Sequence, residues 1–385
     1  MANWCMRGGA VLLCLFVAEA SSAEEAHGVA EPPTDESVGL LPALDLGFGI
    51  PKLSIRGFGH AQYAASFLDP DGGSSNSMNN FANGGVDVFI TSQIAEDVSF
   101  LNEIVFEFGE GGENILDVER VFLKYEHEDW LHVGIGRGHT ALGYWNQQFH
   151  HGTWLQTTTD RPMLFDFEDD GGILPIHFVG IEASGRIKTK PGVFSYSLGV
   201  SNGRGDIVDS VQLVEDATDS KAVALMGRFE PSPVPGFGVG FSAYIDRIPD
   251  NDTPSDGSGP RPRSTREQIY SAHMFYVRRK VEALAEFTVI LHEPSGSPSR
   301  FEHYGGYVLL AYRCSTKTKP YYRFDILVID RADPFYSGLV EDKRRHTVGV
   351  RYEFRKFVAL KAEFQHVDSD SGRENTGILQ ASFAF

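Results

Sequence analysis

The sequence contains little cysteine and no long hydrophobic run. Its three cysteines are Cys5, Cys14 and Cys314. The first two lie in a predicted N-terminal leader, so the rest of the chain cannot form a disulfide framework. A transmembrane helix needs about 20 consecutive apolar residues, and no segment after residue 23 approaches that length. Mean hydropathy is −0.20, which on its own would place the chain among soluble proteins.

Basic residues are also scarce relative to acidic ones. The chain has 34 Lys and Arg against 52 Asp and Glu, and the formal net charge of −18 argues against a nucleic-acid partner. No His-Glu-x-x-His motif of zinc hydrolases occurs. Serine and histidine are scattered along the chain, so we predict neither an enzyme nor a cofactor.

What the sequence does contain is alternation with a period of two. Within residues 376–385, Leu379, Phe383 and Phe385 fall on one face of an extended strand, whereas Gln380 and Ser382 fall on the other. Strands that expose only every second residue to lipid give a low mean hydropathy. The pattern therefore reconciles a soluble-like composition with a membrane protein.

The same alternation recurs and predicts an all-β protein of about sixteen strands. We expect the strands at 52–67, 85–95, 97–108, 116–127, 129–138, 176–187, 192–201, 220–230, 236–246, 268–278, 280–291, 301–313, 319–330, 345–354, 356–367 and 376–385. Alternation is less clear around 117–125 and 268–278.

The connectors between these strands alternate in length. Short turns are followed by longer polar segments at 68–84, 109–115, 139–175, 202–219, 247–267, 292–300, 331–344 and 368–375. Outer-membrane barrels have this asymmetry, with short periplasmic turns and long external loops. We therefore expect one antiparallel transmembrane β-barrel over residues 52–385.

The N-terminal region predicts export. Residues 1–23 combine an early Arg7, a short apolar run and small residues ending at Ala23, which is typical of a cleaved signal peptide. Residues 24–51 have no clear period and are expected to form a periplasmic lead.

Three features together resemble Gram-negative porins. The alternating last strand that ends in Phe385 resembles the assembly signal of outer-membrane barrels, and the strand number and loop order resemble those of sixteen-stranded general porins. Residues 138–157 also look like a segment of porin-like proteins related to phosphate-selective porins. The resemblance implies an outer-membrane homotrimer, in contact with lipid and recognised by the barrel-assembly machinery, through which small hydrophilic solutes or ions diffuse. The alternatives are a phosphate- or anion-specific channel and, from another class, an outer-membrane enzyme or adhesin.

The connector 139–175 is the expected determinant of selectivity. It is rich in aromatic residues, which an exposed loop would not favour, and the third loop of general porins folds into the pore. The candidate constriction residues are Arg161, Asp166, Glu168, Asp169 and Asp170 on this loop and Arg56, Arg120, Arg323 and Arg351 on the wall. The alternative for the wall arginines is simple pairing, for example Arg323 with Asp325 or Arg351 with Glu353.

Three histidines of the same loop raise the question of a metal. His139, His150 and His151, with Asp166 or Glu168, have the ligand types that suit zinc. They lack a fixed ligand spacing, so the sequence favours hydrogen-bonding roles and predicts no metal site.

Overall fold

The computed structural model describes residues 52–70, 74–108, 114–150, 152–167, 171–205, 220–249, 264–336 and 339–385. The signal peptide expected at 1–23 and the lead expected at 24–51 lie outside the described residues. Both remain predictions.

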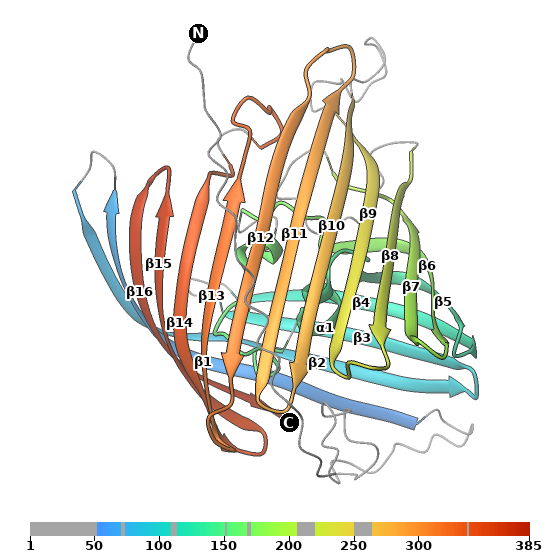
Figure 1. Ribbon diagram of the computed structural model, residues 1–385, viewed down its shortest axis with the longest axis horizontal. Helices are drawn as coiled ribbons and strands as arrows, with labels where there is room; N and C mark the ends of the chain where they lie inside the picture. The colour runs from blue at the N-terminus through green and yellow to red at the C-terminus, as the bar shows by residue number, and fades with distance from the viewer. Residues whose placement is uncertain are drawn as a thin grey trace. The chain divides into compact units, whose positions relative to one another are not determined.

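Sixteen antiparallel strands form a closed barrel in which each strand pairs with its neighbours in sequence (Figure 1). They are β1 Lys52–Pro70, β2 Asn76–Ala95, β3 Val98–Phe108, β4 Asn114–Glu128, β5 Leu131–His139, β6 His177–Lys188, β7 Gly192–Ser201, β8 Ala222–Pro231, β9 Phe237–Pro249, β10 Ser264–Arg278, β11 Val281–Pro294, β12 Phe301–Tyr312, β13 Thr318–Val328, β14 Lys343–Arg355, β15 Val358–Ser369 and β16 Gly372–Ala384. The barrel closes where β1 pairs with β16, from Phe58 opposite Ala384 to Pro70 opposite Gly372. The predicted all-β fold and strand number are confirmed.

Two predicted loops are wrong in extent. The segment 68–84, expected as a loop, is mostly strand, because β1 and β2 continue as a paired hairpin in which Leu68 lies opposite Asn76. The last connector, expected at 368–375, is a tight turn between Ser369 and Gly372. In both places, ladder hydrogen bonds to a neighbouring strand override the low strand propensity of Asn, Ser and Gly. Long and short connectors therefore do not alternate strictly to the end of the barrel.

The two faces of the wall differ in chemistry. Large apolar side chains are exposed on the outside, among them Leu53, Ile55, Leu116, Ile135, Ile181, Leu225, Phe241, Phe287, Leu310, Val348, Phe364 and Leu379. The residues between them, such as Arg323 and Glu363, are buried inside the barrel. An apolar outer band around a polar interior is what a barrel in lipid requires. Among the described residues, no helix is both long and apolar enough to cross a membrane.

Within its described residues, the β5–β6 connector forms two short helices, α1 Tyr144–Phe149 and η2 Met163–Phe165. Trp145, Leu164, Phe165 and Ile173 are almost fully buried and form an apolar cluster with inward residues of the wall, such as Tyr307. This cluster covers the apolar side chains of the aromatic connector inside the barrel.

Candidate functional site

The connector between β5 and β6 spans the barrel. In a closed ring of sixteen strands, β13 and β14 stand eight positions from β5 and β6, which is diametrically opposite. The connector nevertheless reaches them, because Asp160 pairs with Arg323 on β13 and Arg345 on β14, at 2.9 and 2.8 Å. The described residues of the connector thus contact the opposite wall of the barrel, whereas a pore-constricting role for residues 139–175 stays a prediction.

Carboxylates of the wall bind the backbone of the loop. Glu286 accepts hydrogen bonds from the N–H groups of Tyr144 and Trp145, at 2.7 and 2.8 Å, and so binds donors in the first turn of α1. Glu363 accepts from both the backbone N–H and the hydroxyl of Thr159. A buried carboxylate that receives two donors holds its loop segment in one position.

Cations of the wall bind loop carbonyl groups. Arg351 donates to the carbonyl oxygens of Trp154 and Gln156, and Lys361 donates to those of Thr153 and Thr158. These contacts follow one another along the loop, which therefore lies against β14 and β15.

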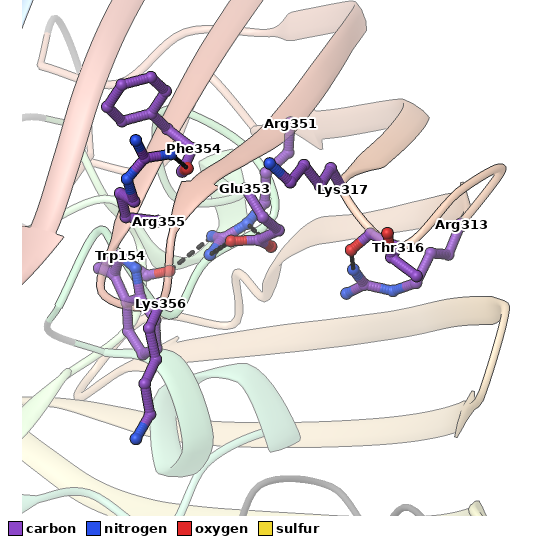
Figure 2. A pocket seen from close by; sticks show the side chains of 9 residues that line it. All are labelled: Trp154, Arg313, Thr316, Lys317, Arg351, Glu353, Phe354, Arg355 and Lys356. Atoms are coloured by element: carbon purple, nitrogen blue, oxygen red, sulfur yellow. Dashed lines mark hydrogen bonds and ion pairs between the residues drawn. The ribbon is translucent and has the colours of Figure 1, made fainter.

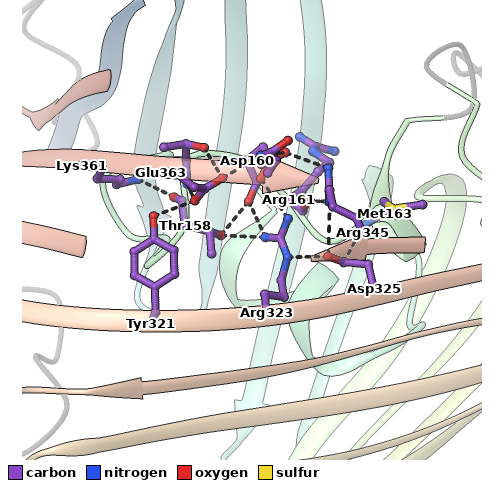
Figure 3. Close-up of polar contacts among 12 residues, drawn as sticks. Thr158, Asp160, Arg161, Met163, Tyr321, Arg323, Asp325, Arg345, Lys361 and Glu363 are labelled. Atoms are coloured by element: carbon purple, nitrogen blue, oxygen red, sulfur yellow. Dashed lines mark hydrogen bonds and ion pairs between the residues drawn. The ribbon is translucent and has the colours of Figure 1, made fainter. Parts of the chain in front are cut away.

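Asp160 is the centre of a polar network that joins the loop to β13 and β14 (Figure 3). Arg323 donates to Asp160, to the hydroxyl of Thr158 and to Asp325, and Arg345 donates to both Asp160 and Asp325. Burial raises the pKa of the Asp160 carboxyl, but Arg345 and Arg323 outweigh it and lower that pKa to about 2. Asp160 is therefore ionised at neutral pH and firmly held.

The loop also contacts the strands at the closing seam. The backbone N–H of Gly152 donates to Asp87 on β2, and Trp154 stacks with Phe58 on β1 at a centroid distance of 6.4 Å. With the contacts to β13–β15, these tie the loop to strands on both sides of the closing seam.

The predicted wall arginines fall into two groups. Arg323 and Arg351 are buried beneath the loop, where they anchor it and also form the predicted pairs with Asp325 and Glu353 at 2.8 Å each. Arg120 and Arg56 are not loop anchors. Arg120 pairs with Glu103, whereas Arg56 is exposed and shares the inward parity of Phe58.

The predicted loop residues are likewise divided. The guanidinium of Arg161 lies 3.7 Å from the ring centroid of Phe167 and donates to the carbonyl oxygens of Phe165 and His150, so it braces the loop. Asp166 is half-buried. Burial raises the pKa of its carboxyl to about 7, partly opposed by Arg345. Glu168, Asp169 and Asp170 lie outside the described residues.

A basic recess opens at the short-turn end of the barrel (Figure 2). It has a volume of about 580 Å³ and is lined by Trp154, Arg313, Thr316, Lys317, Arg351, Glu353, Phe354, Arg355 and Lys356. Five of these side chains are cationic and one is anionic, so the recess favours anions. The sequence did not single it out, because its cations come from two turns that are distant in the chain.

Two of the three candidate histidines meet, but with different partners from those expected. His139 and His150 lie together with His177, so that one ring nitrogen of each falls within 4.8 Å of the others. Asp166 is not in this group, while His151 and Glu168 lie outside the described residues. His177 was missed because it opens β6, far along the chain from His139.

A second cluster of possible metal ligands, which the sequence did not indicate, lies elsewhere in the barrel. His292, His303 and Asp333 are all buried, and the Asp333 carboxylate contacts the two rings at 2.6 and 2.8 Å. The three residues come from β11, β12 and the connector after β13, and no sequence motif links them.

One serine of β7 lies in a sequence pattern that hydrolases share. Residues 199–203 read Gly-Val-Ser-Asn-Gly and match the Gly-x-Ser-x-Gly pattern of hydrolases. In those enzymes the serine stands on a sharp strand-to-helix turn. Here Ser201 is the last residue of β7, opposite Gly180, and no helix follows in residues 202–205.

Comparison with known proteins identifies the fold. No family model matches the chain, and no curated protein matches it in sequence. Among solved structures, the anion-selective porin from Comamonas acidovorans has a TM-score of 0.60 at 9% identity, over 87% of this chain and 100% of that one. The outer membrane channel DcaP of Acinetobacter baumannii has a TM-score of 0.57 at 11% identity, over 88% of this chain and 98% of that one. Salmonella typhi OmpF, solved with daunomycin, has a TM-score of 0.56 at 12% identity, over 87% of this chain and 98% of that one. The chain has the fold of Gram-negative outer-membrane porins.

Proposed function

We propose that the protein is an outer-membrane channel through which small hydrophilic solutes or ions diffuse passively. The observation that carries this proposal is the loop that crosses a closed sixteen-strand barrel and is anchored on the far wall by Asp160. Barrels of this strand number enclose an aqueous channel unless they are plugged, and a loop that crosses the lumen narrows the channel. The apolar outer band supports a place in lipid.

Deletion of residues 145–170 tests the proposal. Single-channel conductance in planar bilayers should rise and selectivity should fall, because the anchored loop is removed from the lumen. Heat-modifiable migration on gels checks that the variant still forms a barrel. Unchanged currents would contradict a constricting role, and absence of any conductance in the folded wild type would favour the enzyme or adhesin alternatives.

The acidic part of the loop is the proposed source of cation preference. Replacing Asp166, Glu168, Asp169 and Asp170 by Asn or Gln should shift the reversal potential toward anions. Their local field is strongest at low ionic strength, because the Debye length is about 10 Å at 0.1 M salt and about 3 Å at 1 M. The shift should therefore shrink as salt is raised.

A second candidate function is a channel for anions. The basic recess supports it, since its cations would attract an anionic solute at the short-turn mouth. Block of the current by one anion, such as inorganic phosphate, would favour this specific channel, whereas ohmic currents that phosphate leaves unchanged would favour the general porin.

The remaining expectations concern export and assembly. We propose cleavage of the signal peptide after Ala23, a periplasmic lead at 24–51, insertion by the barrel-assembly machinery through the strand ending in Phe385, and a homotrimer. N-terminal sequencing of the exported protein checks the cleavage site. Native mass spectrometry that finds only monomers would refute the trimer and leave the channel intact.

A further inference from the structure

Three imidazole rings meet at the base of the inward loop. His139 ends β5 and His177 begins β6, and the two lie directly opposite each other in the ladder. His150 follows α1 and packs on both, with ring centroids 4.0 Å from His139 and 4.8 Å from His177. The rings of His150 and His177 are almost completely buried. Three protonated rings so close together would repel one another.

A carboxylate lies beside His177 because of a β-bulge. Between β3 and β4, Glu103 lies opposite Arg120 and Ile104 opposite Val118, so Glu119 is the extra residue. The bulge turns Glu119 inward, where it is buried, and its Oε2 lies 2.5 Å from Nε2 of His177. Bulges commonly re-aim a side chain in this way.

The tautomer of His150 is set by its neighbour. The side-chain amide of Asn146 donates to the carbonyl oxygens of Thr140 and Ile176, so its Oδ1 is left as an acceptor for Nδ1 of His150 at 2.8 Å. Nδ1 therefore carries the proton, and Nε2 presents a lone pair. Metal-binding histidines are held in this manner, with the second ring nitrogen donating to an oxygen.

In the cluster of His292, His303 and Asp333, the ring of His303 has the opposite tautomer from that of His150. Nδ1 of His303 accepts a hydrogen bond from the backbone N–H of Asp330. Its Nε2 must then carry a proton, which it donates to Asp333 at 2.8 Å. That nitrogen has no lone pair for a metal, so this group is a closed hydrogen-bond network and provides an internal control.

We propose that His139, His150, His177 and Glu119 form a binding site for a transition metal of the zinc type. Three imidazoles and one carboxylate supply four ligands, and zinc in structural sites is almost always four-coordinate and tetrahedral. Ligand atoms of such a site stand roughly 3.4 Å apart. The three imidazole nitrogens, already within 4.8 Å of one another, need only small ring rotations, and the Glu119 carboxylate beside His177 must turn toward the other two rings. The metal would join α1 of the loop to β4, β5 and β6, and so fix the loop at its base.

The charge balance makes Glu119 the most important ligand. Arg137 is the neighbouring cation: its Nε donates to the carbonyl oxygen of Glu119, and its Nη2 lies 4.0 Å from the Glu119 carboxylate. A divalent ion beside this guanidinium requires the negative charge of Glu119. Glu119→Gln should therefore weaken binding more than the loss of any single imidazole.

The experiment uses the full mature barrel in detergent, stripped with a chelator and then titrated with Zn²⁺ or Co²⁺. We expect one metal per chain by elemental analysis, and the visible absorption of tetrahedral Co²⁺. His150→Gln and His177→Gln should each weaken binding by about a hundredfold or more, and Asn146→Ala by about 10- to 100-fold, the usual effect of losing an outer hydrogen-bond partner. His303→Gln should leave affinity unchanged.

Two results would overturn the proposal. One is a folded wild-type barrel, verified by heat-modifiable migration, that binds neither Zn²⁺ nor Co²⁺. The other is binding that His150→Gln leaves intact or that His303→Gln weakens equally, since the metal would then lie elsewhere. The wild-type Co²⁺ spectrum decides the question even where a variant fails to fold. None of these measurements depends on channel activity.

Discussion

The ring of Phe385 lies across Gly57 at the seam where the barrel closes. The two residues exchange backbone hydrogen bonds of 2.8 and 2.9 Å, and a Cβ atom on Gly57 would lie 2.3 Å from the ring and 2.8 Å from the carbonyl oxygen of Asp87. The terminal aromatic residue thus covers a position where only glycine leaves room for it.

We expect Gly57→Ala to destabilise the seam. The methyl group must displace the Phe385 ring, and overpacking of this kind costs about 1–3 kcal/mol. The temperature at which the folded band disappears on gels should fall. Gly377→Ala on β16 is the matched control, because a Cβ there meets nothing within 4 Å; an equal loss in both variants would contradict the role of the ring.

Arg323→Ala should release the middle of the loop. The change removes one of the two guanidinium groups that pair with Asp160 and Asp325, and removing one partner of a buried ion pair costs about 3–5 kcal/mol. Protease cleavage within 145–165 should become faster, and current noise should increase.

The control for Arg323 is Lys188→Ala. Lys188 pairs with Asp129 at 2.7 Å, but both side chains are largely exposed, and pairs in full contact with solvent contribute little to stability. If both variants behave like the wild type, the Asp160 network does not hold the loop.

Ion selectivity should depend on pH near neutrality through Asp166. Burial raises the pKa of its carboxyl to about 7, with Arg345 opposing and Asp160 adding to the rise. The folded protein holds the Asp166 proton more tightly than the unfolded chain, whose pKa is the ordinary 3.8. The contribution of Asp166 to stability is therefore fully present below pH 3.8 and is lost as the pH rises through about 7. Above pH 7 the loop gains a negative charge and is held less firmly.

Reversal potentials recorded across this range measure the effect. Cation preference should increase as pH rises through about 7, and Asp166→Asn should abolish the change. If the Asp166→Asn variant keeps the full change of reversal potential with pH, another titratable group causes it.

The basic recess predicts a salt-dependent effect at the short-turn mouth. Replacing Lys317 and Lys356 by Glu reverses two of its charges, so the reversal potential should shift toward cations. The shift should be larger at 0.1 M salt than at 1 M, as the Debye length falls from about 10 to about 3 Å. A shift independent of salt would argue against a field effect.

Much of the architecture could be predicted because its determinants are local. Alternation along β16, or along β13 with Arg323 and Asp325 on one face, needs only the period of two that the pleat imposes. The aromatic residues of 139–175 likewise predicted a loop that packs against another surface of the protein. Predictions failed where pairing decided the conformation, as in 76–84, which the ladder with β1 converts from loop to strand.

The sequence by itself determined the strand number and the face of each regular strand, and it predicted that the loop 139–175 folds inward. Only the tertiary structure decided what that loop touches: Arg323 and Arg351 anchor it, and His177 joins His139 through the β5–β6 register. The indistinct alternation around 117–125 is the bulge that turns Glu119 inward, and its register depends on β3. Such contacts join residues that are dozens to more than a hundred positions apart, so they exist only once the barrel has closed.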